Sequence, residues 1–131
     1  MRFLEKRRWL AVTITILIGL EIFFFSTLSG KTTGAGISII PIIYHFCVFF
    51  LLNFFLLNAT IHKEKINTKI FFISILATVI YAILDELHQY FVPFRGSSFG
   101  DFLVDFLGIA VSTLIYLHIK NKTISKSENY F

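Results

Sequence analysis

Ionisable side chains are scarce in this chain: Asp, Glu, Lys and Arg make up 15% of the 131 residues, whereas hydrophobic residues make up 56%. A globule of this size must cover itself largely with polar groups, so the composition excludes an ordinary soluble domain. The one cysteine, Cys47, excludes a disulfide within the chain. The sequence has no glycine-rich phosphate loop, no zinc-finger spacing of Cys and His and no internal repeat, so we predict a single domain over residues 1–131.

Long apolar runs are what the chain has instead. Runs of about 20 residues are long enough to cross a bilayer as helices. The connections between them are short, so neighbouring helices should be antiparallel, and we predict an all-α fold, an integral membrane four-helix bundle. Residues 120–131 are polar and rich in Ser, Lys and Asn, which favours a disordered tail. The predicted spans cover residues 9–28, 37–57, 70–91 and 99–119.

Basic residues alternate between the two sides of these spans, which predicts the orientation of the chain. Under the positive-inside rule both termini and the connection after the second span are cytoplasmic, and the other two connections face outward. This arrangement accounts for the net charge of +4 without nucleic acid as a partner, and it predicts a multi-pass plasma-membrane protein in contact with membrane lipids. The cytoplasmic set is Arg2, Lys6, Arg7, Arg8, Lys63, Lys65, Lys69, Lys120, Lys122 and Lys126, whereas only Lys31 and Arg95 fall on the outer side.

One short segment, residues 85–101, holds three of the eight acidic residues, one of the four histidines and one of the two basic residues on the outer side. Ionisable groups beside membrane-length runs are costly, so each of them needs a partner or a function. Pro93 should end the third helix, and Ser98 followed three residues later by Asp101 fits the capping pattern that begins a helix. By the predicted orientation this segment lies at the outer face.

Counting the rise along each helix from its cytoplasmic end places four ionisable groups in one layer. Asp85 lies roughly 22 Å up the third span and Asp105 roughly 21 Å up the fourth, with His45 and Glu21 at roughly 18 Å in the second and first. We therefore predict that Asp85 and Asp105 face each other, with His45 within hydrogen-bonding reach of one of them. The alternative is that such a layer only holds the helices in register, as is expected of Asn53 lower in the bundle.

Helical periodicity then predicts which residues of the segment lie on the same face of the third helix. His88 and Gln89 lie at i+3 and i+4 from Asp85 and share its face, whereas Glu86 is rotated away by about a quarter turn. We predict that the catalytic groups are Asp85, Glu86, His88 and Asp105, and that the substrate-binding groups are Gln89, Arg95, Asp101, His45 and Ser98.

The order Asp85-Glu86-Leu87-His88-Gln89, Phe91-Val92-Pro93, Arg95, Asp101, Asp105 and Gly108 resembles the VanZ-like family of small polytopic membrane proteins, named for an accessory protein of glycopeptide resistance. Phe25-Ser26 and His45 extend the resemblance to the first two spans. The chain departs from the family pattern at Ile42, Phe49, Phe94 and Asp105. The resemblance implies a cell-envelope protein, and its founding member is linked to lowered teicoplanin susceptibility.

The sequence leaves several functions open, including whether the chain is an enzyme. In the first, the outer site binds or acts on an anionic envelope lipid or cell-wall precursor: Arg95 holds the anion, and His88, oriented by Asp85, acts as acid or base. In the second, Asp85, His88, Asp101 or Asp105, and His45 bind a metal ion. The others are a small transporter or proton relay, alone or as a homo-oligomer, and a structural interaction protein.

Overall fold

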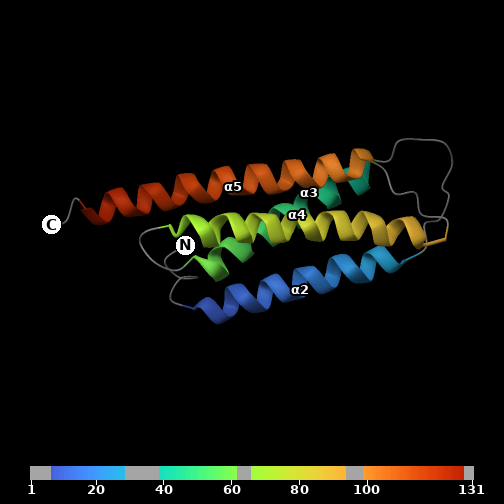
Figure 1. Cartoon of the computed structure of the whole chain (residues 1–131), viewed down its shortest axis with the longest axis horizontal. Helices are drawn as coiled ribbons and strands as arrows, with labels where there is room; N and C mark the ends of the chain where they lie inside the picture. The colour runs from blue at the N-terminus through green and yellow to red at the C-terminus, as the bar shows by residue number, and fades with distance from the viewer. Residues whose placement is uncertain (1–6, 29–38, 62–65, 94–98, 129–131) are drawn as a thin grey trace.

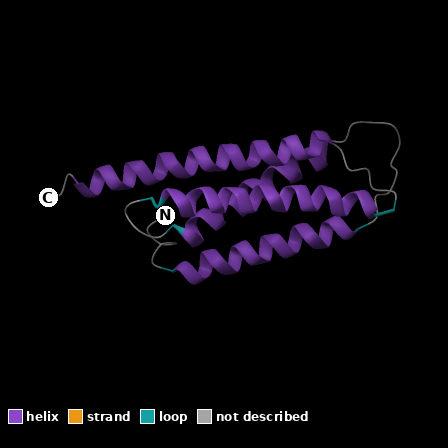
Figure 2. Cartoon of the chain, viewed as in Figure 1, coloured by secondary structure: helices purple, strands orange, loops and turns teal. Residues whose placement is uncertain are grey.

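The apolar runs form helices in the computed structural model, which describes residues 7–28, 39–61, 66–93 and 99–128 (Figure 2). Each of the four helices is long and apolar enough to cross a membrane, and the described residues contain no strand. The all-α, membrane-helix prediction is confirmed. In chain order the helices are α2 (Arg8–Thr27), α3 (Ile39–Thr60), α4 (Thr68–Phe91) and α5 (Phe99–Glu128).

The ends of α4 follow local chemistry. Asn67 caps its start, where the side-chain oxygen accepts the Ile70 N–H at 3.2 Å. At the other end Val92 is extended, at φ −84° and ψ 125°, as expected of a residue before proline, so Pro93 ends the helix as predicted. The last turn of α4, which carries Gln89, therefore stops at a defined place.

The last helix is longer than expected. We predicted a disordered tail from residue 120, but α5 continues through Glu128, so that prediction is wrong up to this residue. Residues 120–128 contain neither Pro nor Gly, and extending an existing helix avoids the cost of starting a new one. Lys120 is buried, and the Thr123 hydroxyl donates to the Ile119 carbonyl at 2.9 Å.

Consecutive helices run antiparallel, so α2 begins and α5 ends at the same end of the bundle (Figure 1). α3 and α4 each pack against the other three helices, whereas α2 and α5 make no contact with each other over their described residues. The interface between α3 and α5 is the most extensive. Side chains of α3 and α4 can therefore contact side chains of every other helix.

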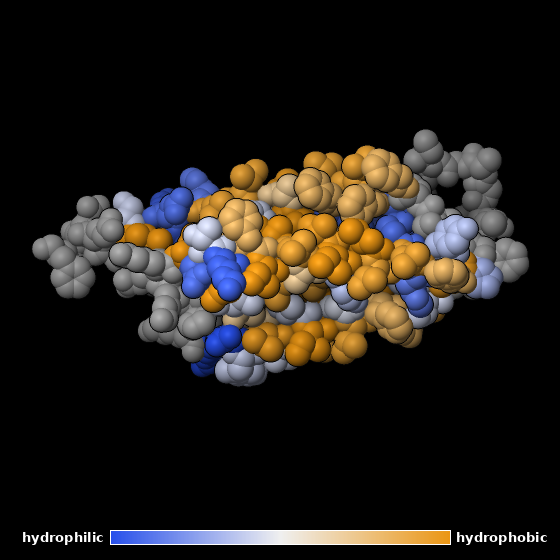
Figure 3. Space-filling model, viewed as in Figure 1, coloured by the Kyte–Doolittle hydropathy of each residue, from blue (hydrophilic) through white to orange (hydrophobic). Residues whose placement is uncertain are grey.

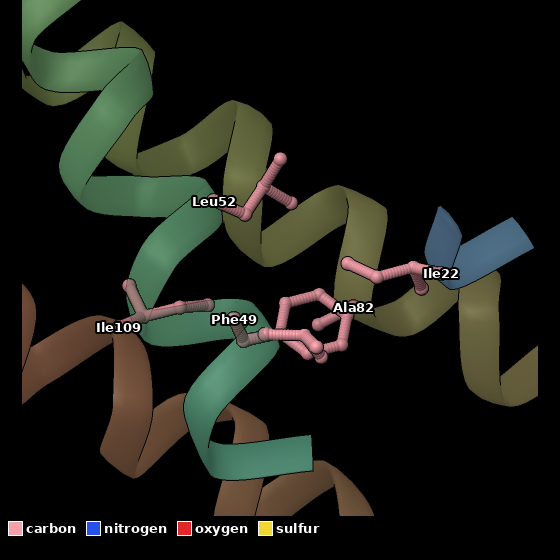
Figure 4. Packing of buried hydrophobic residues seen from close by; sticks show 6 residues of the cluster. Ile22, Phe49, Leu52, Ala82 and Ile109 are labelled. Carbon is pink, nitrogen blue, oxygen red and sulfur yellow. The ribbon is translucent and has the colours of Figure 1, made fainter. Parts of the chain in front are cut away.

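The apolar core lies where side chains of the four helices meet (Figure 4). Phe49 of α3 is fully buried and lies among Ile22 of α2, Ala82 of α4 and Ile109 of α5. The outer surface is also apolar: Figure 3 shows hydrophobic side chains across the middle of this face, with hydrophilic ones toward the ends. A helix that is apolar all round suits a lipid environment on one side and a packed core on the other.

Close approach of α3 and α5 depends on small and polar residues. A Cβ atom added to Gly108 would lie 2.5 Å from the Phe46 carbonyl oxygen, so only glycine fits there. The Asn53 amide donates to Ser112 Oγ at 3.2 Å and to Thr113 Oγ1 at 3.0 Å, and its oxygen accepts from Thr78 at 3.4 Å. Asn53 thus joins α3, α4 and α5, which confirms its predicted role in helix packing.

Candidate functional site

Buried polar side chains gather in one layer of the bundle, toward the ends of α2 and α4 and the beginnings of α3 and α5. These side chains come from all four helices, and five of them are at most 6% exposed, Glu86 alone being half-buried. We call this set the polar layer: Ser26 of α2, His45 of α3, Asp85, Glu86 and Gln89 of α4, and Asp105 of α5.

Asp85 is held by two hydrogen bonds. The Ser26 hydroxyl donates to its Oδ1, and the Gln89 side-chain amide donates to its Oδ2 at 2.7 Å. The same amide lies 3.5 Å from Ser26 Oγ. Gln89 follows Asp85 by one helical turn, so this contact confirms that the two share a face. The two bonds fix the orientation of the carboxylate.

His45 and Asp105 form the second half of the layer. His45 Nδ1 lies 2.9 Å from Asp105 Oδ1, which confirms the prediction that this histidine reaches one of the two buried aspartates. The other oxygen, Asp105 Oδ2, is buried and has no hydrogen-bond partner among the described residues. Asp105 itself is 0% exposed. A buried carboxylate oxygen with no donor is costly, so it marks a place where another group is expected to bind.

The two halves meet. His45, Asp85, Glu86 and Asp105 each direct one nitrogen or oxygen atom so that these atoms all lie within 4.8 Å of one another. Asp85 and Asp105 therefore belong to a shared layer, as predicted. Glu86 starts about a quarter turn away from Asp85 on α4, toward a neighbouring helix or the opening of the site, and its longer side chain still brings a carboxylate oxygen to the group.

Two predictions about the layer need correction. Glu21 is not in the group: it is half-buried, and its Oε1 accepts from the Tyr44 hydroxyl at 3.2 Å. His88 does not pair with Asp85 over the described residues, so the predicted orientation of its ring by that carboxylate is wrong. Its ring lies 5.1 Å from that of Phe23, and its Nε2 is buried without a hydrogen-bond partner in the described part of the chain.

The remaining predicted residues lie nearer the end of the bundle or beyond the described part. Asp101 is half-buried in the first turn of α5, one turn before Asp105. Arg95 and Ser98 lie outside the described residues. Ser26 was not predicted as a site residue; the available signal was the Phe25-Ser26 pair in the looser part of the family resemblance.

Comparison with known families agrees with this architecture. Residues 2–121 match the family model described as VanZ/LLP1, which covers nearly the whole chain and every residue of the polar layer. The chain belongs to the VanZ-like family. No curated protein and no solved structure matches it. Together with its four apolar helices, membership makes it a VanZ-like multi-pass membrane protein.

Charge determines what the polar layer of this VanZ-like protein can do. Three carboxylates meet beside one imidazole, and like charges in a medium of low polarity cannot all ionise cheaply. The layer must therefore take up protons or a cation, or accept hydrogen bonds from a bound molecule. An isolated pair holding two helices in register would need neither the third carboxylate nor the orphaned oxygen of Asp105.

Proposed function

We propose that this VanZ-like protein binds the anionic head group of an envelope lipid or cell-wall precursor at the outer end of its bundle. The observation that supports the proposal best is the polar layer itself, buried within four helices that have an apolar outer surface. Ionisable residues within membrane spans are expensive, and more of them gather here than helix packing requires.

The depth of the layer suits a head group. Asp85 precedes the last residue of α4, Phe91, by about 9 Å along the helix, and Asp105 follows the first residue of α5, Phe99, by the same distance of about 9 Å. A molecule with acyl or polyprenyl chains against the apolar surface has its polar part near this depth. The distribution of basic residues leads us to expect that this end faces outward.

The charges of the site suggest which groups of the site bind which part of such a head group. Carboxylates repel phosphate, so the phosphate belongs at Arg95, which stands in the sequence between Phe91 and Phe99, and near the positive end of α5. Hydroxyl or ammonium groups of the same molecule suit the carboxylates of Asp85, Glu86 and Asp105, which accept hydrogen bonds. A head group that carries both phosphate and sugar fits this division.

Any chemistry on the bound molecule would use the same groups as acid or base. Asp85, Glu86 and Asp105 each bring a carboxylate oxygen within 4.8 Å of the others, and His88 follows Asp85 by about one turn of α4. By this proposal Gln89 and His45 orient the carboxylates, and Asp101 and Ser98 help to bind the same molecule. A change in glycopeptide susceptibility is the cellular effect that the family resemblance suggests.

Replacing Arg95 by lysine tests the proposal. Lipids that co-purify with the protein in mild detergent are identified and quantified by mass spectrometry for the wild type and for Arg95→Lys. We expect the wild type to retain a phosphorylated lipid. The amount of this lipid bound to Arg95→Lys should be at least about tenfold lower, because lysine keeps the charge but not the paired donors. Lys69→Gln, an exposed change at the other end of α4, should retain it.

Two outcomes would contradict the proposal. One is that Arg95→Lys retains the lipid as well as the wild type does. The other is recovery by a charge-swapped pair, Arg95→Asp with Asp101→Arg, since this would mean that Arg95 serves only an ion pair. Teicoplanin susceptibility of cells that express each variant at equal membrane levels gives an independent readout of the same comparison.

A further inference from the structure

We propose that His45, Asp85, Glu86 and Asp105 bind one divalent transition-metal ion inside the bundle, of the class that includes Mn²⁺, Fe²⁺ and Zn²⁺. The ligands come from α3, α4 and α5, so the ion joins three helices. The head-group proposal directs hydroxyl or ammonium groups at the same three carboxylates, so the metal ion is a second kind of occupant of the polar layer. Its binding can be tested without any lipid.

The spacing of the ligand atoms fits a single ion. Metal–ligand bonds of about 2.1 Å place neighbouring ligand atoms about 3 Å apart and opposite ones about 4.2 Å apart. The 2.9 Å between His45 Nδ1 and Asp105 Oδ1 matches the separation of neighbours. The whole group spans at most 4.8 Å, so side-chain movements within about 1 Å bring the four atoms into one coordination shell.

An independent observation points to a ligand at the same place. Asp105 is 0% exposed, yet its Oδ2 has no hydrogen-bond partner within the described part of the chain. This carboxylate is the one already bonded to His45, so its second oxygen lies beside the group of ligand atoms. A cation bound there satisfies the oxygen and neutralises two of the three carboxylate charges.

The donor set narrows the class of ion. Ca²⁺ and Mg²⁺ prefer shells made only of oxygen, whereas an imidazole with carboxylates suits Mn²⁺, Fe²⁺ and Zn²⁺. Carboxylates and imidazoles that project into a helical bundle are the ligand pattern of carboxylate-bridged metal proteins. The surroundings also fit, since Ser26 and Gln89 both donate to Asp85 and hold its carboxylate in place, as outer-shell partners of metal ligands do.

Metal titration of the full-length protein in detergent tests the site. The protein is stripped with chelator and titrated with MnCl₂, with free Mn²⁺ counted by electron paramagnetic resonance, and ZnCl₂ is then added as competitor. We expect one Mn²⁺ per chain, displaced by Zn²⁺. Asp105→Asn should weaken binding more than about 100-fold, since even outer-shell changes cost 10–100-fold. Glu86→Gln, at a half-buried position that perturbs the fold less, should weaken it at least about tenfold.

Glu21→Gln is the matched control, because it removes a carboxylate of α2 that lies outside the group and is bonded to Tyr44. It should bind Mn²⁺ as the wild type does. The proposal is wrong if the wild type binds no stoichiometric metal, or if Glu86→Gln binds as tightly as Glu21→Gln. Should Asp105→Asn fail to fold, Glu86→Gln decides the question. Since no lipid is added, failure here leaves the Arg95 comparison to be judged separately.

Discussion

Replacing Gly108 by alanine should separate α3 from α5 and weaken the whole bundle. The new Cβ atom would lie 2.5 Å from the Phe46 carbonyl oxygen and 3.1 Å from the Phe50 backbone nitrogen. Both neighbours are backbone atoms of a packed helix, so neither can turn aside as a side chain would. The helices themselves must move.

The size of the movement sets the size of the effect. Ordinary contact begins near 3.4 Å, so α5 must shift by about 0.9 Å from α3. A gap of that size forfeits a quarter to a half of the local dispersion energy, and it carries the 3.2 Å bond from Asn53 to Ser112 beyond hydrogen-bonding distance. Overpacking of this kind costs about 1–3 kcal/mol, and each lost interhelical hydrogen bond about 0.6 kcal/mol more.

Unfolding in mixed detergent micelles, followed by circular dichroism, measures this cost. Gly19→Ala is the control, because its Cβ would meet only the Tyr81 hydroxyl at 3.9 Å, an ordinary contact. Gly19→Ala should therefore be neutral or slightly stabilising, as expected from helix propensity. Equal free energies of unfolding for the two variants would refute the claim that α3 and α5 are in backbone contact at Gly108.

Two further predictions concern orientation and packing. In a Cys47→Ser background, S97C should react with an impermeant maleimide in intact cells and N67C should not, and the reverse pattern would invert the proposed topology. Asn53→Leu should lower the free energy of unfolding by about 1–2 kcal/mol, because it breaks hydrogen bonds to α4 and α5. Asn58→Leu, whose amide bonds within its own helix to the Phe54 carbonyl, should cost less, and an equal loss would contradict the assigned role of Asn53.

Depth along the helices could be predicted from the sequence because the helical rise per residue is nearly constant. Counting residues was enough to place Asp85, Asp105 and His45 in one layer, and the contact between His45 and Asp105 lies in that layer. The end of α4 could be predicted equally well, since Pro93 restricts the backbone of the residue before it whatever the tertiary structure.

Rotation of each helix about its axis could not be predicted in the same way. Glu21 has nearly the right depth but faces Tyr44, whereas Glu86 has an unfavourable rotation and still reaches the layer through its longer side chain. Helices that are apolar on nearly all sides have no strong periodicity to reveal which face is buried. The partnership of Ser26 with Asp85 depends on that same rotation, since a serine in an apolar helix alone indicates no partner.

The order of the helices along the chain affects how the buried acids enter the bilayer. Synthesis proceeds from the N-terminus, so Ser26 is made before its partner Asp85, and His45 before its partner Asp105. An aspartate at the centre of a membrane helix raises the free energy of insertion by about 2.5–3.5 kcal/mol. When each acidic helix is inserted, the partner that offsets part of its insertion free energy, Ser26 or His45, has therefore already been synthesised. A circular permutant that began with α5 would expose Asp105 to lipid until α3 was made, although its finished bundle would be the same.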